Sequence, residues 1–152
     1  MALESGMYHI FSKLGDGPVG RRNVEDLSLN PKGVYKLPQG AEDAVWVVEK
    51  LSTGNYTLKI WGAIVGALDT RVLAFLNEDQ ALLARTEWTL QCDESDAEGN
   101  AYVVTKAGGH QDGWVVDNTN VLEPIMVRPI ITGRSLPPYY PPSEVFVFKK
   151  VN

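Results

Sequence analysis

The sequence is poor in cysteine and histidine, with one cysteine and two histidines among its 152 residues. A single thiol, Cys92, excludes an intramolecular disulfide, so the fold must be held together by packing and hydrogen bonds. The residues around Cys92 alternate between apolar and polar, as they do in a half-buried strand. We therefore predict a packing role for the Cys92 side chain.

Basic residues are also scarce relative to acidic ones. The formal net charge is -5 and the pI is about 5.0, which argues against a broad phosphate-binding surface. Nucleic acids and anionic membranes are therefore not expected as partners. The first residues show neither a basic n-region nor an apolar h-region, and no apolar run approaches the length of a membrane span. We expect a cytoplasmic protein.

The side-chain groupings that enzymes need are missing from the sequence. His9 falls inside a predicted strand, and His110 lies in a glycine-rich turn. There is no G-x-S-x-G elbow, no phosphate-binding glycine loop and no pair of clusters with metal-ligand spacing. The densest carboxylate run, residues 93–98, does not match a calcium-binding loop and is interpreted as a solvated turn. We predict no enzyme activity, no catalytic residues, no metal site and no cofactor.

Strand signals run through the whole chain, which is long enough for a single domain spanning residues 1–152. Apolar residues alternate with period two, and Gly, Pro, Asn and Asp interrupt them every few residues. A helical pattern is present only at residues 78–85, which suit a short helical turn. The predicted strands are 8–11, 45–48, 56–61, 72–76, 88–90, 102–104, 114–116, 124–127 and 145–148.

An imperfect repeat becomes visible when the chain is divided into three rows. A Gly-Tyr strand opens each row, and an aromatic-x-apolar strand precedes it, with the last such strand at the carboxyl end. The repeated tyrosines are Tyr8, Tyr56 and Tyr102, and the repeated aromatics are Trp46, Trp88 and Phe146. Three copies with ends that meet predict an all-β protein, a β-trefoil of three pseudo-repeats of four strands whose repeated aromatics fill the core. The alternative is a Greek-key sandwich.

One loop is much longer in the first row than in the other two. In the first row, a short second strand contains Val19-Gly20 and a third strand contains Val34. Residues 20–33 connect them and carry a basic pair, Arg21 and Arg22, in an extended pattern. Insertions in a repeat fold mark functional loops, because the shared strands tolerate them. We expect exposed cations in this loop. Arg21 adjoins Gly20 and can still belong to the second strand, which leaves residues 22–24 nearest the exposed tip. Lys32 is a weaker candidate, because it follows Asn30-Pro31 and precedes Gly33, as in a turn back into the third strand.

The chain resembles the mushroom β-trefoil serine protease inhibitors, which are related to the fungal mycocypin-type cysteine protease inhibitors. The resemblance spans the whole chain and rests on residues 3–10, 19–27 and 146–148, together with the absence of disulfides. It implies reversible, substrate-like inhibition of a trypsin-like serine protease by a monomer. The reactive loop would then contain Arg21, Arg22, Asn23, Val24 and Glu25, because these residues lie in the loop between the second and third strands.

Within that loop, we predict that Asn23 occupies the primary pocket of the protease, with Arg22 beside it. A trypsin-like pocket favours a long cation, but the resemblance also allows an asparagine at this position. Two alternatives stay open, an inhibitor of papain-like cysteine proteases and a carbohydrate-binding lectin. The lectin is disfavoured because none of the glutamines begins a Gln-x-Trp signature; they are Gln39, Gln80, Gln91 and Gln111.

Overall fold

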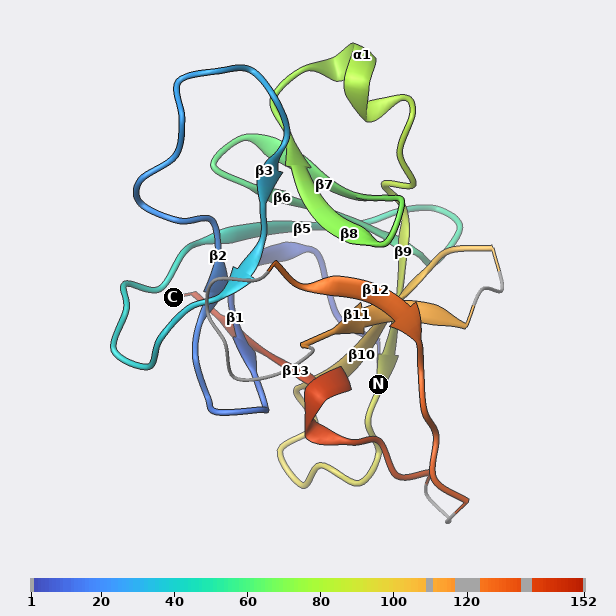
Figure 1. Ribbon diagram of the computed structural model, residues 1–152. Coiled ribbons are helices and arrows are strands. Elements are labelled where there is room, and N and C mark those ends of the chain that lie inside the picture. The colour runs from blue at the N-terminus through green and yellow to red at the C-terminus, as the bar shows by residue number, and fades with distance from the viewer. Residues whose placement is uncertain (1, 109–110, 117–123, 135–137, 152) are drawn as a thin grey trace.

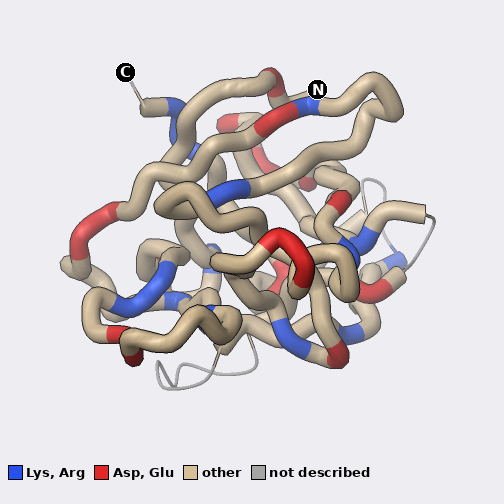
Figure 2. Tube along the Cα trace, turned by 90° about the horizontal axis from the view of Figure 1, so that it is seen from above, with Lys and Arg blue, Asp and Glu red and all other residues tan. Residues whose placement is uncertain are grey.

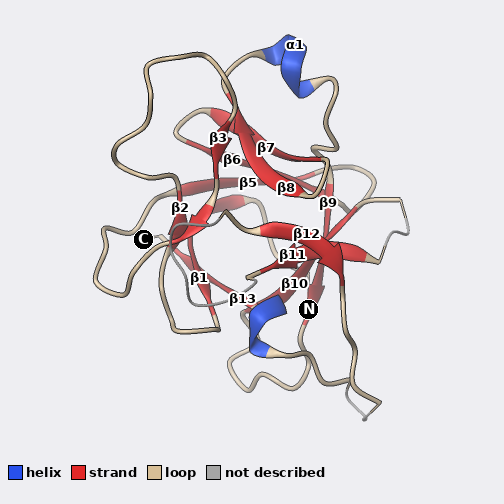
Figure 3. Ribbon diagram, in the orientation of Figure 1, coloured by secondary structure: helices blue, strands red, loops and turns tan. Residues whose placement is uncertain are grey.

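The computed structural model describes residues 2–108, 111–116, 124–134 and 138–151. Strands and loops make up nearly all of this part of the chain, and the two helical elements are single short turns (Figure 3). The elements are β1 (Gly6–Ser12), β2 (Val19–Gly20), β3 (Lys32–Gly33), β4 (Tyr35–Lys36), β5 (Trp46–Lys50), β6 (Tyr56–Ile60), β7 (Ala63–Leu68), β8 (Arg71–Phe75), α1 (Glu78–Ala81), β9 (Trp88–Cys92), β10 (Ala101–Lys106), β11 (Asp112–Val115), β12 (Met126–Pro129), the 3-10 turn η1 (Pro142–Glu144) and β13 (Phe146–Lys150).

Most of the described strands form a closed barrel (Figure 1). Nine strands pair in the cyclic order β11-β12-β8-β7-β6-β5-β1-β13-β10, and β10 pairs again with β11. Two further strands attach to this ring: β3 pairs with β8, and β9 pairs with both β10 and β6. Strands β2 and β4 form a separate two-stranded sheet. The two ends of the chain meet in the barrel, because β1 lies antiparallel to β13.

The prediction of an all-β protein is confirmed, but the predicted β-trefoil of three four-stranded units is wrong. The finding that overturns it is the pairing itself, a nine-stranded barrel with two extra strands. In the first predicted row, the later strands shrink to the two-residue β2, β3 and β4, and β3 pairs with β8 of the second row. A sequence repeat shows which positions are apolar or small. Which strands pair with each other depends instead on which strand edges meet in the folded chain.

The core is built from the repeated aromatic residues, as the sequence predicted. Trp46, Trp88 and Phe146 are fully buried, and all three surround the buried Trp114 with ring centroids 5.5–6.0 Å from it. Two of these indoles also hold neighbouring strands: Trp46 Nε1 donates to Val19 O at 2.8 Å, and Trp88 Nε1 donates to Val65 O at 3.0 Å. The first of these bonds fixes β2, the strand that leads into the long loop.

Cys92 lies in β9 and packs against the core with its side chain partly exposed, so its predicted packing role is confirmed. Charged residues of both signs are interspersed over the described part of the chain (Figure 2). No described helix is long and apolar enough to cross a membrane.

Candidate functional site

The long loop predicted from the first row is present as residues 21–31, which connect β2 to β3 without regular secondary structure. In Figure 1 it projects from the barrel on the same side as α1. Its apolar side chains are turned to solvent, with Val24, Leu27 and Leu29 exposed by 84%, 102% and 68%. Arg22 and Asn23 are exposed as well. The loop therefore presents both polar and apolar groups to a partner.

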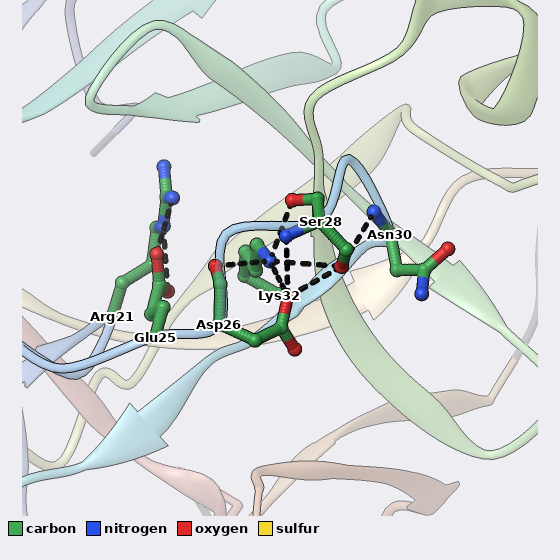
Figure 4. A network of polar contacts seen from close by, with 6 residues as sticks. All are labelled: Arg21, Glu25, Asp26, Ser28, Asn30 and Lys32. Atoms are coloured by element: carbon green, nitrogen blue, oxygen red, sulfur yellow. Dashed lines mark hydrogen bonds and ion pairs between the residues drawn. The ribbon is translucent and has the colours of Figure 1, made fainter.

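Arg21 holds the first half of this loop in place. Its Nη2 and Nε donate to the two carboxylate oxygens of Glu25 at 2.6 and 3.0 Å (Figure 4). The guanidinium also lies 4.9 Å from the ring centroid of Trp61, in cation–π contact. The Arg21 side chain is only 7% exposed, so the prediction of an exposed cation at this position is wrong. Arg21 and Glu25 are thus brought together, and the three residues between them are exposed.

Lys32 holds the second half of the loop. Its Nζ donates to Asp26 Oδ1 at 2.7 Å, to Asp26 O at 3.1 Å and to Ser28 O at 2.9 Å (Figure 4). Lys32 is 6% exposed and is the first residue of β3, so its interpretation as a turn back into the third strand is confirmed. Its buried ammonium is used to organise residues 26–28 and is not available to enter a protease pocket.

Asp26 gathers hydrogen bonds at the centre of this second half. Besides Lys32, the backbone N–H of Ser28 donates to Asp26 Oδ1 at 2.9 Å, and the Ser28 hydroxyl donates to the same oxygen. The hydrogen bond from Lys32, followed by those from Ser28, lowers the pKa of the Asp26 carboxyl to about 2. The Asp26 carboxyl is therefore ionised at neutral pH.

Open space adjoins residues 22–24, the tip of the loop. A cavity of about 580 Å³ separates the tip from residues 37–45 and from Trp61, whose backbone has φ of 50° and whose side chain is 52% exposed. A second hollow of about 360 Å³ lies between the tip and β3, β4 and β8. Arg22 contacts the scaffold through Tyr35, with the guanidinium 5.7 Å from the ring centroid. The tip thus extends away from the barrel, while the ion pairs of Arg21 and Lys32 hold the residues on either side of it.

The predicted reactive-loop residues are brought together in one segment, but they divide into two structural groups. Arg21 and Glu25 form the internal ion pair, whereas Arg22, Asn23 and Val24 are exposed between them. Sequence reasoning listed all five as contact residues. It did not identify Asp26, Ser28 and Lys32 as a network that orders the loop, although an acidic residue six positions before a lysine was visible.

Side chains with catalytic potential do not cluster in the described residues. His9 Nδ1 lies 2.9 Å from Ala44 O, so this nitrogen carries the proton, while His110 lies outside the described residues. In the described ranges, no group of three or more His, Cys, Asp or Glu side chains could hold a metal ion. The prediction of a solvated turn at residues 93–98 is wrong for Asp93. This residue is 3% exposed and accepts hydrogen bonds from the backbone N–H and the hydroxyl of Ser95.

Comparisons with known proteins show the family of the chain. The family model described as peptidase inhibitor I66 matches residues 1–150. A serine protease inhibitor from Lentinula edodes is 32% identical over 151 residues, which cover 99% of both chains. A solved proteinase inhibitor from Coprinopsis cinerea is 32% identical with a TM-score of 0.87, covering 99% of this chain and 100% of that one.

A more distant structure shares the fold alone. SeviL, solved with the asialo-GM1 saccharide, has a TM-score of 0.63 and 15% identity, covering 97% of this chain and 99% of that chain. The full-length matches to two inhibitors confirm the resemblance noted in the sequence, and the family consists of protease inhibitors and not enzymes. The chain belongs to the peptidase inhibitor I66 family.

Proposed function

We propose that this protein is a reversible inhibitor of trypsin-like serine proteases, and that residues 22–24 enter the protease cleft as a substrate would. The observation that carries the proposal is an exposed tip held by two ion pairs: Arg21–Glu25 spans the tip, and Lys32–Asp26 orders the residues that follow it. The serine protease inhibitor from Lentinula edodes supports serine proteases as the class of target, and the proteinase inhibitor from Coprinopsis cinerea supports inhibition of proteases in general.

The physical argument concerns pre-ordering. A flexible loop loses conformational freedom when it binds, and this loss lowers affinity, whereas a loop that is already fixed does not incur it. The Arg21–Glu25 pair would also join the two sides of the tip after a peptide bond within it is cut, because Arg21 precedes the tip and Glu25 follows it. The two new ends then stay in register in the cleft, so that religation competes with release. The chain therefore acts as an inhibitor instead of being degraded as a substrate.

The geometry narrows the choice of residue for the primary pocket. Arg21 and Lys32 are buried and are engaged with carboxylates, which leaves Arg22 as the exposed cation within the tip and Asn23 as its neighbour. We retain Asn23 as the residue in the pocket. Its amide is too short to reach a buried carboxylate directly and would contact it through a bridging water. Arg22 would lie beside the pocket, where it can pair with acidic groups at the rim.

Titration of the pure protein against trypsin, chymotrypsin and papain tests the class of target. We expect inhibition of trypsin at one inhibitor per protease, by a monomer, and weaker or no inhibition of papain. Preferential inhibition of papain would contradict the proposal in favour of a cysteine protease inhibitor. Retention on galactose or lactose matrices, with elution by the free sugar, would favour a lectin.

Separate Arg22→Ala and Asn23→Ala variants test the tip itself. Both side chains are exposed, so each variant should stay folded. The variant that removes the anchor should lose more than about 2 kcal/mol of binding free energy, roughly thirtyfold in the inhibition constant. Arg134→Ala is the matched control, because Arg134 is an exposed cation on another loop. If both tip variants inhibit like the parent while Arg134→Ala or Lys106→Ala does not, the reactive loop lies elsewhere.

A further inference from the structure

The loop between β8 and β9 carries two leucines that are directed into solvent. Leu82 and Leu83 are exposed by 83% and 78%, directly after the single turn of α1. Isolated exposed apolar residues are common on protein surfaces, but adjacent ones on an ordered element are typical of contact sites. No role of these leucines in folding accounts for their position, because neither belongs to the described core.

Hydrogen bonds hold the turn that presents the leucines. Asn77 caps α1 by accepting a hydrogen bond from the backbone of Asp79 at 2.8 Å. The backbone N–H groups of Leu82 and Leu83 donate to Glu78 O and Gln80 O at 3.2 and 3.1 Å. The segment then returns to the barrel, where Arg85 and Ala67 exchange two backbone hydrogen bonds of 3.0 and 2.7 Å. Both leucines are thus held in place without being buried.

This turn lies beside the loop of residues 21–31. Strand β3 is antiparallel to β8, with Lys32 opposite Ala74. The residues just before Lys32 therefore lie next to the residues that follow Ala74, so the two loops leave the barrel at the same edge. Figure 1 shows both loops projecting on this side of the barrel. The exposed Leu27 and Leu29 belong to the first loop, and we call Leu27, Leu29, Leu82 and Leu83 the leucine edge.

The size of a protease complex indicates what covers the leucine edge. A stable complex buries about 800 Å² on each partner and involves roughly 20–30 residues on each side. Residues 21–31 alone are too few, and two charged side chains among residues 21–32 are already buried against the scaffold. Surfaces beside the loop must supply further contacts, and the apolar character of the leucine edge matches the dehydrated centre of such interfaces.

We infer that the leucine edge is a secondary contact surface for the same protease whose cleft receives residues 22–24, an inference that rests on the proposed function. The surface it meets is an apolar patch beside the protease cleft. Such a contact forms outside the primary pocket, so it slows dissociation of the complex and selects among proteases with similar pockets.

The double variant Leu82→Ala/Leu83→Ala tests this inference, with Ile131→Ala, on the loop between β12 and η1, as the matched control. Ile131 is 66% exposed, so all three substitutions remove solvent-facing apolar groups and leave the core intact. Inhibition constants and dissociation rates are measured with trypsin and a short peptide substrate. We expect the double variant to raise the inhibition constant about tenfold or more, mainly through faster dissociation, and the control to change it less than about twofold.

Three outcomes would overturn the inference. Inhibition that is unchanged in the double variant, while Arg22→Ala or Asn23→Ala weakens it, leaves the proposed function standing and removes the secondary contact. Loss of inhibition in the double variant, with both tip variants unaffected, makes the leucine edge the primary site and contradicts both proposals. A parent protein that is dimeric in sedimentation, and becomes monomeric in the double variant with unchanged inhibition, assigns the leucine edge to a second copy of this chain.

Hydrogen exchange provides an independent readout. In the complex with trypsin, amides of residues 78–85 should exchange more slowly than in the free protein, together with those of residues 21–31. Protection confined to residues 21–31 would contradict a contact at the leucine edge.

Discussion

Lys32 Nζ lies 2.7 Å from Asp26 Oδ1, and this ion pair holds the second half of the exposed loop against Lys32, the first residue of β3. The lysine is buried while the carboxylate is largely exposed, with side-chain accessibilities of 6% and 71%. Because the carboxylate is solvated, the pair adds little to the stability of the whole protein, but it restricts the loop.

Replacement of Lys32 should weaken inhibition more than it weakens the fold. In Lys32→Met the aliphatic stem is kept, while the hydrogen bonds to Asp26 and Ser28 are lost, so residues 26–28 gain freedom. We expect the inhibition constant to rise about tenfold, or ~1.4 kcal/mol, and the loop to be cut faster by trypsin. Lys13→Met is the control, because it removes a comparable pair with Asp96 on a different loop. Equal effects of the two variants on inhibition would contradict the bracing role.

The same ion pair should respond to acid at an unusually low pH. The pKa of Asp26 is about 2 in the folded protein and 3.8 for the free side chain. A lowered pKa stabilises the folded loop above pH 3.8, and this stabilisation declines as the pH falls and is lost below about pH 2. The titration can be followed by the NMR shift of the Asp26 carboxyl carbon. We expect Lys32→Met to move its midpoint upward; a parent midpoint near 3.8 would show that the pair does not form.

The buried tryptophans offer a matched test of how the barrel supports the loop. Trp46→Phe and Trp88→Phe each leave a buried carbonyl, of Val19 or Val65, without its indole donor. Each should lower the free energy of unfolding by about 1–3 kcal/mol, measured by urea denaturation. Val19 lies in β2 directly before the loop, whereas Val65 lies in β7. We therefore expect Trp46→Phe to weaken inhibition and Trp88→Phe to leave it unchanged; equal losses would show that β2 does not transmit the effect.

Glu144 should make the protein less stable at neutral pH than in mild acid. Its side chain is 1% exposed, and burial raises the pKa of its carboxyl above 4.5. A raised acid pKa means that the folded state holds the proton more tightly, so stability falls as the pH rises through 4.5 and levels off above the native pKa.

Two substitutions separate charge from hydrogen bonding at this position. Glu144→Gln keeps an acceptor for the backbone N–H of Ile131, which donates to Glu144 Oε1 at 2.7 Å. It should be more stable than the parent at pH 7 and lose this advantage in acid. Glu144→Ala should lose about 1–3 kcal/mol at both pH values, because the Ile131 N–H is left unpaired. Urea unfolding at pH 7 and pH 4 distinguishes the cases, and a Glu144→Gln variant weaker than the parent at pH 7 would contradict the burial penalty.

The sequence predicted the parts of this structure that depend on local pattern. Alternating apolar residues located most strands, and the repeated aromatics Trp46, Trp88 and Phe146 are buried as expected. The pairing was not predicted, because the two-residue strands β2, β3 and β4 have too few residues to show alternation. Likewise, the exposure of Arg21 was misjudged: its charge is visible in the sequence, but its partners Glu25 and Trp61 depend on the folded loop.

The peptide bond at which the protease acts tests the central claim most directly. Trypsin incubated for a long period with excess inhibitor cuts a substrate-like inhibitor slowly at the bond held in its active site, and mass spectrometry of the products identifies that bond. We predict two fragments, residues 1–23 and 24–152, from cleavage between Asn23 and Val24, in a protein that still inhibits trypsin after cleavage. A single slow cleavage outside residues 22–24, for example after Arg134, in a protein that still inhibits would contradict the assignment of this loop.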